Sequence, residues 1–327
     1  MKKLIAVLLA LSCMLIGAAA VAETLNIAYM PNYGSLWSVE TAINKGYFEE
    51  EGLTINLVEF ADGPTIIAAM ESGSIDMGYI GQGAHKLCIN GRASIFALSH
   101  ISNGDALIGG KGITTVEDLK GKVVAYSSGT SSEDILKNSL DKAGMTMDDI
   151  KAMDMDASAI VTAMLSGGVD ACATWSPNSL KILEEMPDAA KLTDNMTFSD
   201  TTVSLASWIC MPKYGEENHD LLVRFTRALF KGMDYSANEH YDEVSEWVSK
   251  QTATDYESVY NQRGDAQWLT GKEVAEALAQ LAGSPIDKKK IELETKDIKD
   301  AGVFNGKVRL HVGVVASFKI QVEVEQA

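Results

Sequence analysis

Short apolar runs alternate with amphipathic stretches through the first two thirds of the chain. The apolar runs predict strands because they are bounded by Gly, Ser, Asn or Asp, and the longer amphipathic stretches predict helices. The expected strands span residues 24–30, 54–60, 75–80, 94–100, 122–126, 150–155 and 170–175. The expected helices span residues 36–45, 65–72, 134–143, 157–165 and 178–185, with one more from about residue 84. This order predicts an α/β fold with helices on both faces of largely parallel sheets.

The pattern restarts near residue 114 and changes beyond Lys213, where it becomes mainly helical. Two extended stretches, residues 105–110 and 201–211, can carry the chain between the two sets of strands. We therefore predict two lobes of mixed sheets flanked by helices, with a cleft between them. Two crossings without a flexible linker favour a hinge that closes on a ligand. The expected division is residues 23–108 and 208–327 for lobe 1, and residues 109–207 for lobe 2.

The loops that follow the expected strands hold the candidate binding residues. In open α/β sheets, ligands bind beyond the carboxyl ends of the strands. Here those ends lead into loops rich in Gly, Ser and Asn, which should converge on the cleft. Asp62 and Asn103 lie in two of these loops and are candidate ligand contacts. Asp62 precedes Gly63 and Pro64, so a simple turn residue is the alternative.

One loop, at residues 127–132, carries five hydroxyl side chains between an apolar strand and an amphipathic helix. Thr130 fits the N-cap of that helix, and Glu133 fits the position that closes a capping box. The other hydroxyls, the free N–H groups and the positive end of the helix dipole favour a bound anion. We therefore expect a cap and an anion site in one place, with the hydroxyls before the helix facing the ligand.

Residues 1–22 have the anatomy of an export signal. Two lysines precede an apolar stretch and a small-x-small sequence that ends at Ala22, which predicts cleavage before Glu23. Lipid attachment at Cys13 stays open as an alternative, although the residues before it match the lipoprotein pattern poorly. No later stretch reaches the roughly 20 continuous apolar residues of a spanning helix. We expect a soluble protein in the periplasm or at the extracytoplasmic face.

Composition narrows the class of function. The chain of 327 residues is 46% hydrophobic and 22% charged, and its net charge is -17. This acidity argues against a nucleic-acid partner, because phosphate binding needs clustered Lys and Arg. The histidines and cysteines show no metal-ligand spacing, and no nucleophile elbow or phosphate loop occurs. We expect no metal, no cofactor and no catalysis; one disulfide among Cys88, Cys172 and Cys210 stays open.

Four segments carry a resemblance to a known family. They read GYFEEEGLTI at 46–55, AAMESGSIDMG at 68–78, DLKGKVVA at 118–125 continuing into Gly129-Thr130-Ser131, and AMLSGGVDA at 163–171 with Trp175 and Pro177. In this order, behind an export signal, they resemble the ABC-transporter substrate-binding proteins of the nitrate, sulfonate and taurine type. Thiamine-precursor-binding proteins share this fold. The resemblance covers residues 24–250.

This resemblance implies a two-lobe periplasmic-binding-protein fold of type II. It also implies a monomer that captures a small anionic or zwitterionic solute, such as a sulfonate, nitrate or taurine. The solute would pass to an ABC permease and its ATPase, and the helix N-terminus after residue 130 would take the oxyanion. The binding residues that the motifs imply are Asn32, Tyr33, Gln82, Gly83, Ser127, Gly129, Thr130, Ser131 and Trp175.

Three alternatives stay open. The ligand can be an aminopyrimidine thiamine precursor or another small heterocycle, since Asp62, Asp105 and Asp156 suit a cationic or zwitterionic solute. A periplasmic sensor would have the same fold and no importer. An enzyme of thiamine-precursor synthesis shares the fold, but its cysteine-rich stretch is missing here. The end of the chain departs from the family, because residues 308–324 alternate as strands do.

Overall fold

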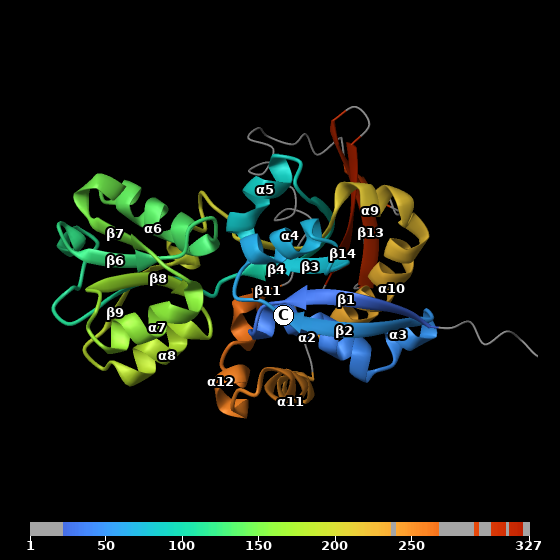
Figure 1. The fold of residues 1–327 in the computed structure, drawn as a ribbon, viewed down its shortest axis with the longest axis horizontal. Helices are drawn as coiled ribbons and strands as arrows, with labels where there is room; N and C mark the ends of the chain where they lie inside the picture. Colours follow the sequence, from blue (N-terminus) through green and yellow to red (C-terminus); the bar gives the residue numbers. More distant parts are fainter. Residues whose placement is uncertain (1–21, 237–239, 268–290, 294–301, 312–313, 323–327) are drawn as a thin grey trace, which may run out of the picture.

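The structure, a computed structural model, describes residues 22–236, 240–267, 291–293, 302–311 and 314–322. Two α/β units lie side by side in it (Figure 1), each built on its own sheet. We call the six-stranded sheet with its helices the first lobe, and the five-stranded sheet with its helices the second lobe. The predicted export signal, up to residue 21, and Cys13 lie outside the described residues.

The first lobe has a mixed sheet in the order β11-β4-β10-β3-β1-β2. β1 runs parallel to β2 and β3, whereas β10 runs antiparallel to β3 and β4, and β11 runs antiparallel to β4. The strands are β1 (Glu23–Tyr29), β2 (Leu53–Glu59), β3 (Met77–Ile80), β4 (Ser94–Ser102), β10 (Leu205–Cys210) and β11 (Ala266–Gln267).

Helices from both ends of the chain cover this sheet. α2 packs against α10 and α11, so the C-terminal helices return to the first lobe as predicted, and α4 packs against β3. The helices of this lobe are α2 (Tyr33–Asn44), α3 (Tyr47–Glu50), α4 (Gly63–Glu71), α5 (His85–Ile89), α9 (Pro212–Glu217), α10 (His219–Ser236), α11 (Tyr241–Thr252) and α12 (Tyr256–Tyr260), with the short 3₁₀ turns η1 (Gln82–Ala84) and η5 (Arg263–Asp265).

The second lobe has the strand order β7-β6-β8-β5-β9. β6 runs parallel to β7 and β8, and β5 runs antiparallel to β8 and β9. Side chains alternate between two cores, since Leu107 packs with the α6 residues and Ile108 packs with the α7 residues. The elements are β5 (Asp105–Gly109), β6 (Val123–Tyr126), α6 (Ser131–Lys142), β7 (Lys151–Asp154), α7 (Ala157–Leu165), β8 (Ala171–Trp175), α8 (Asn178–Glu185) and β9 (Ala190–Asp194), with η2 (Glu117–Leu119), η3 (Met147–Asp149) and η4 (Asn195–Phe198).

The chain passes between the lobes twice, from β4 into β5 and from η4 into β10. β5 lies whole in the second sheet and β10 lies whole in the first. The boundaries after residues 108 and 207 stay predictions. The sheets are less parallel than expected, because β4, β5, β9, β10 and β11 pair antiparallel. The α/β class, with two mixed sheets flanked by helices, is confirmed.

A third sheet follows near the end of the chain. It pairs β12 (Ile291–Leu293), β13 (Gly302–His311) and β14 (Val314–Val322) antiparallel in that order. The strand-like alternation predicted for residues 308–324 thus falls on β13 and β14 within the described residues.

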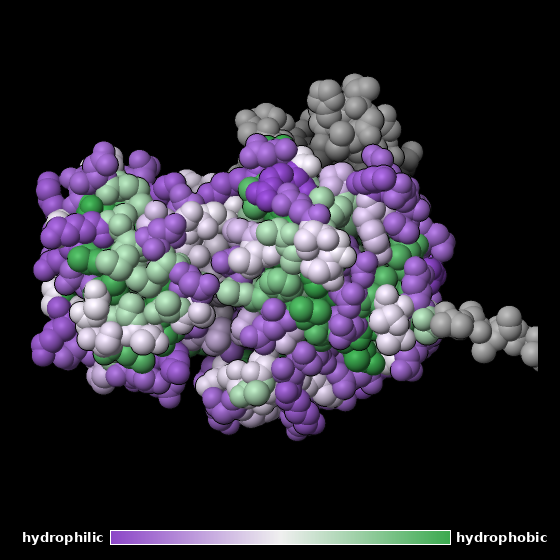
Figure 2. All heavy atoms as spheres, viewed as in Figure 1, coloured by the Kyte–Doolittle hydropathy of each residue, from purple (hydrophilic) through white to green (hydrophobic). Residues whose placement is uncertain are grey.

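On the face shown in Figure 2, hydrophilic side chains surround the outer edges of both lobes. Within the described part of the chain, no helix is both long enough and apolar enough to span a membrane.

Gly232 sets the distance between α10 and α2. A Cβ at this position would lie 2.3 Å from the carbonyl oxygen of Ser38 and 3.1 Å from the Cβ of Ala42. We expect Gly232→Ala to lower the free energy of unfolding by about 1–3 kcal/mol, since overpacking outweighs the gain in helix propensity. Urea unfolding measures this. Gly264→Ala is the control, because its Cβ meets nothing within 4 Å. Equal stability of the Gly232 variant and the parent would contradict this account of the packing.

Candidate ligand-binding site

A cavity lies where the two lobes meet. It has a volume of about 60 Å³ and opens to solvent, and residues of both lobes line it. The first lobe contributes the loops after β1 and β3 and the end of β4. The second lobe contributes the start of β5, the N-terminus of α6 and the end of β8. This is the position that the loops after the strands predict.

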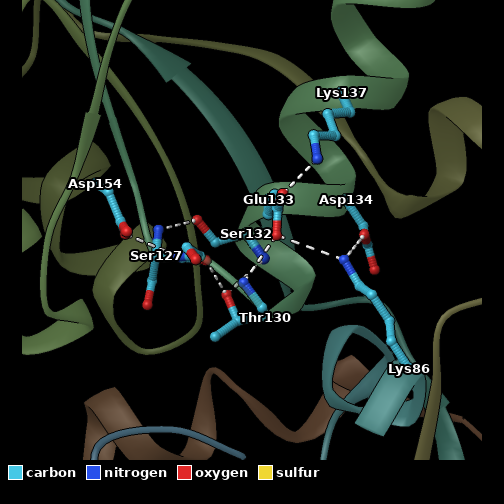
Figure 3. Close-up of polar contacts among 10 residues, drawn as sticks. Lys86, Ser127, Thr130, Ser132, Glu133, Asp134, Lys137 and Asp154 are labelled. Atoms are coloured by element: carbon cyan, nitrogen blue, oxygen red, sulfur yellow. Dashed lines mark hydrogen bonds and ion pairs between the residues drawn. The ribbon is translucent and has the colours of Figure 1, made fainter. Parts of the chain in front are cut away.

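The N-terminus of α6 forms one wall of the cavity. Figure 3 shows the polar contacts around this helix start. Thr130 is the N-cap, as predicted, and its hydroxyl accepts a hydrogen bond from the N–H of Ser132 at 3.2 Å. The prediction that Glu133 closes a capping box is wrong. The Glu133 carboxylate accepts instead from the N–H of Gly129 at 2.8 Å, one residue before the cap. Gly129 has a φ of 74°, and this left-handed conformation turns its N–H toward Glu133.

Three of the five hydroxyls of this loop donate to acceptors within the protein. Thr130 donates to the carbonyl oxygen of Ser127 at 2.7 Å, Ser131 donates to Asp105 at 2.5 Å, and Ser132 donates to the carbonyl oxygen of Ala173 at 2.7 Å. A hydroxyl has one proton to donate. The expectation that these three hydroxyls face an anion is therefore corrected, because their protons are already used.

The backbone of the same loop keeps two donors. The N–H of Ser127 bonds to Ser132, and the N–H of Ser128 bonds to Asp154. The N–H groups of Thr130 and Ser131 have no hydrogen-bond partner among the described residues. Both residues line the cavity, where the positive end of the α6 dipole adds to their attraction for an anion.

The two lobes touch at this helix. A Cβ on Gly83 in η1 would lie 2.0 Å from the carbonyl carbon of Thr130 and 2.4 Å from the nitrogen of Ser131. Lys86, two residues after η1, forms ion pairs with Glu133 at 3.4 Å and Asp134 at 3.1 Å (Figure 3). The first lobe is thus closed onto the second, and only a glycine fits at position 83.

Glu133 links the helix start to both lobes. Burial acts to raise the pKa of Glu133, but hydrogen bonds from Lys137 and from the Gly129 N–H, with the charge of Lys86, lower it to about 2. The carboxylate is therefore ionised at every physiological pH, and it stays available to Lys86.

Two carboxylates also line the cavity. Asp105 is 2% exposed, and it accepts hydrogen bonds from Ser131, Asn195 and Ser204. Burial raises the pKa of Asp105, and these three hydrogen bonds act against the rise. Burial likewise raises the pKa of Asp265 to about 6. The Ser176 hydroxyl acts to lower the pKa of Asp265, and Asp105 acts to raise it.

The cavity has no cationic side chain among its described lining residues. His100 lies in the lining, but burial lowers its pKa to about 3, so it is neutral. The rings of Tyr79 and His100 stack with their centroids 5.9 Å apart. Trp175 comes from β8 of the second lobe and yet packs against the core of the first. The site is therefore an aromatic and acidic chamber with one positive wall.

The predicted site residues fall into three groups. Those that line the cavity are Asn32, Thr130, Ser131 and Trp175. Those at the contact between the lobes are Gly83 and Gly129. A Cβ added to Gly129 would lie 3.3 Å from Cγ of Pro64. The others lie outside the described cavity lining: Tyr33, Asp62, Gln82, Asn103 and Ser127.

The residues outside the lining have structural partners. The Tyr33 side chain is buried in the first core, and Asp62 caps α4 by accepting from the N–H of Thr65 at 2.9 Å. Gln82 accepts from the N–H of Leu205 at 3.1 Å, and the Asn103 N–H donates to the carbonyl oxygen of Asp265 at 2.8 Å. Ser127 supplies the acceptor for Thr130. Asp105 and Asp156 were the two further acidic candidates. Asp105 lines the cavity, whereas Asp156 caps α7.

The polar residues of the cavity that sequence reasoning missed include Gln262 and Asp265. Both lie beyond residue 250, where the family resemblance ends. Gln262 accepts from the N–H of Tyr33 at 3.0 Å, and β11 then pairs with β4 and fixes the segment beside the cavity. β11 has only two residues, so no periodic pattern could have indicated it.

Comparison with known proteins assigns the family. Residues 38–241, well over half of the chain, match the family described as NMT1/THI5 like. The chain belongs to this family. A Brucella abortus protein named as a binding protein is 30% identical over 237 residues, which is 72% of this chain and 74% of that protein. A Bacillus subtilis protein named as an aliphatic sulfonates-binding protein is 27% identical over 283 residues, which is 81% and 83% of the two chains. The predicted resemblance is confirmed.

Solved structures share the fold. The periplasmic aliphatic sulphonate binding protein of Escherichia coli has a TM-score of 0.63 at 21% identity, covering 79% of this chain and 90% of that one. A desulfurization enzyme, DSZB, has a TM-score of 0.58 at 15% identity, covering 79% and 91%. At such identities the likeness shows the fold alone.

The end of the chain has relatives of its own. Residues 269–324 match the C-terminal domain of ribosomal protein L9. The large ribosomal subunit protein bL9 of Caldicellulosiruptor saccharolyticus is 43% identical over 54 residues, which is 16% of this chain and 36% of that one. This match accounts for the departure from the family pattern near the C-terminus.

Gly83→Ala tests the contact between the lobes. The added methyl group would overlap the backbone of Thr130 in the closed arrangement only. We therefore expect the radius of gyration of the variant to stay at the value of the open form when ethanesulfonate or taurine is added, whereas the parent becomes more compact. The melting temperature of the variant without ligand should equal that of the parent. Small-angle scattering measures the radius. Gly81→Ala, whose Cβ meets nothing within 4 Å, should close as the parent does. Normal closure of the Gly83 variant would show that this contact does not limit the lobes.

Proposed function

We propose that this protein is the extracytoplasmic solute-binding component of an ABC importer, and that it captures a small organic sulfonate in the cavity between its lobes. The observation that carries the proposal is the N-terminus of α6, where Thr130 and Ser131 line the cavity and their N–H groups have no partner among the described residues. Relatives in this family support the ligand class. Besides the Bacillus protein, a taurine-binding periplasmic protein of Escherichia coli is 25% identical over 197 residues, which is 59% of this chain and 61% of that protein.

The charge of the wall suits a singly charged oxyanion. The N–H groups of Thr130 and Ser131, with the helix dipole, supply about half a positive charge. No lysine or arginine joins them among the described lining residues, so a doubly charged phosphate would be left poorly neutralised. A singly charged sulfonate can be held by this partial positive charge, and the rings of Tyr79 and Trp175 can contact its carbon chain.

Closure makes capture selective. The two crossings between the lobes let the second lobe rotate as a body, which brings the Thr130–Ser131 peptide against Gly83. A ligand that bridges both walls stabilises the closed form, whereas a ligand that contacts one wall does not. The closed form is then the state that the permease and its ATPase would recognise.

We also propose the remaining features predicted from the sequence. Cleavage after Ala22 would release a monomer without a lipid on Cys13, and the lobes would divide at residues 108 and 207. Binding is favoured over catalysis because burial raises the pKa of Cys88 to about 11, of Cys172 to about 12 and of Cys210 to about 11. These thiols are not among the lining residues of the cavity. The described residues also hold no cluster of metal ligands.

A ligand screen tests the function. Mature protein starting at Glu23 is mixed with ethanesulfonate, taurine, nitrate, bicarbonate or an aminopyrimidine, and melting temperature and radius of gyration are recorded. We expect a sulfonate to raise the melting temperature and to reduce the radius, because a ligand at 100 times its Kd stabilises the native state by about 2.7 kcal/mol. Neither effect with any sulfonate would refute the proposal. Stabilisation by the aminopyrimidine alone would favour the thiamine-precursor alternative.

Thr130→Ala separates the two roles of the loop. The variant loses the N-cap, so we expect its free energy of unfolding to fall by about 1 kcal/mol. Its sulfonate affinity should stay within about threefold of the parent once the proteins are compared well below their melting temperatures, because the ligand contacts N–H groups. Thr130→Ser keeps the cap and is the control. A loss of affinity above tenfold without a loss of stability would show that the hydroxyl itself binds the anion.

A further inference from the structure

The segment of residues 255–267 lies against the cavity on the side of the first lobe. It contains α12, η5 and β11 (Figure 1), and it contributes Gln262 and Asp265 to the lining. The match to the family ends at residue 241, before this segment begins. We call residues 255–267 the returning segment. Its contacts give it a role that the family match does not assign.

Gln262 is held at each of its polar groups. Its side chain is 2% exposed, its Oε1 accepts from the N–H of Tyr33 at 3.0 Å, and its Nε2 donates to the carbonyl oxygen of Ser258 at 3.0 Å. Its backbone N–H donates to the carbonyl oxygen of Val259 at 3.0 Å, and its carbonyl oxygen accepts from the N–H of Asp265 at 2.9 Å. Because the side-chain amide faces one donor and one acceptor, only one orientation satisfies both.

The bond to Tyr33 caps α2 from outside the helix. Tyr33 is the first residue of α2, and the first N–H groups of a helix have no partner within it. The N-cap, Asn32, accepts from the N–H of Ser35 at 2.8 Å, so the Tyr33 N–H is left to Gln262. Asn32 and Gly34 line the cavity. Gln262 therefore holds the turn that forms the α2 side of the cavity.

The far end of the returning segment is tied to the first crossing between the lobes. The carbonyl oxygen of Asp265 accepts from the N–H of Asn103 at 2.8 Å, and β11 pairs with Ile101 and Ser102 at the end of β4. Asn103 lies between β4 and β5, where the chain passes into the second lobe. Since Gln262 and Asp265 also bond to each other through the backbone, one hydrogen-bonded turn joins the start of α2 to this crossing.

We propose that Gln262 is a positioning residue of the binding site, which holds the first turn of α2 in place and joins it to the crossing from β4 into β5. The inference rests on the proposed function and does not depend on which sulfonate is captured. A wall that is ordered before the solute arrives loses little conformational entropy on binding, whereas a loose wall must be ordered at the expense of affinity. The returning segment thus prepares the first lobe for closure.

A pair of glutamine variants tests the inference. Gln262→Met keeps the size of the side chain and removes its hydrogen bonds, so we expect at least a tenfold loss of ethanesulfonate affinity in isothermal titration of the mature protein. Gln251→Met is the matched control, because Gln251 also bonds across the first lobe, from α11 to the Tyr29 hydroxyl at 3.1 Å, and lies outside the described cavity lining. Its affinity should stay within about threefold of the parent.

Hydrogen exchange gives a readout that needs no ligand. In Gln262→Met the N–H of Tyr33 has lost its acceptor, so residues 33–35 should exchange at least tenfold faster than in the parent, with no change at the start of α6. Gln251→Met should exchange at the parent rate in both places. Gln262→Glu keeps an acceptor for the Tyr33 N–H, so exchange of residues 33–35 should return close to the parent rate in this variant.

The outcomes separate this proposal from the proposed function. Parent-like ethanesulfonate affinity in Gln262→Met would overturn the positioning role and leave sulfonate capture standing. Equal losses of affinity in Gln262→Met and Gln251→Met, or faster exchange throughout the protein, would show a general loss of stability and would also overturn it. Binding of no sulfonate by the parent would refute the proposed function, and the exchange of residues 33–35 would then decide by itself whether Gln262 holds α2.

Discussion

The close approach of Gly83 to the Thr130–Ser131 peptide is the contact on which the site depends. It places backbone against backbone across the two lobes, with no side chain between them. Any Cβ at position 83 would hold the lobes apart, and the N-terminus of α6 would then face solvent rather than an enclosed cavity. In water, the attraction of two N–H groups for an anion is weak, whereas in a closed chamber of lower dielectric it is strong. The geometry of one glycine therefore decides whether the helix terminus can serve as a binding wall.

The chamber that this contact closes is polarised. The N-terminus of α6 offers N–H groups and a helix dipole, and Asp105 and Asp265 add carboxylates to the same lining. Neither set of groups supplies a formal positive charge, so the site rejects ligands by the charge they fail to match rather than by steric exclusion alone.

Much of this organisation can be predicted from the sequence, and the failures have physical causes. The alternation of apolar runs indicated both lobes, and the hydroxyl-rich loop indicated the cap at Thr130, because both signals are local. The role of the hydroxyls could not be predicted, since their acceptors Asp105 and Ala173 lie 26 and 41 residues away in the chain. Asp265 was missed because β11, which places it, has too few residues to show a strand pattern. Tyr33 and Asp62 were expected at the ligand because they follow strands, but the core and the cap of α4 use them.

The most direct test of the whole account is a crystal structure of the mature protein with taurine. The account predicts sulfonate oxygens about 3 Å from the backbone nitrogens of Thr130 and Ser131, with Gly83 in contact with the α6 peptide. Taurine bound with its amine toward α6, or bound while the lobes stay apart at Gly83, would contradict it.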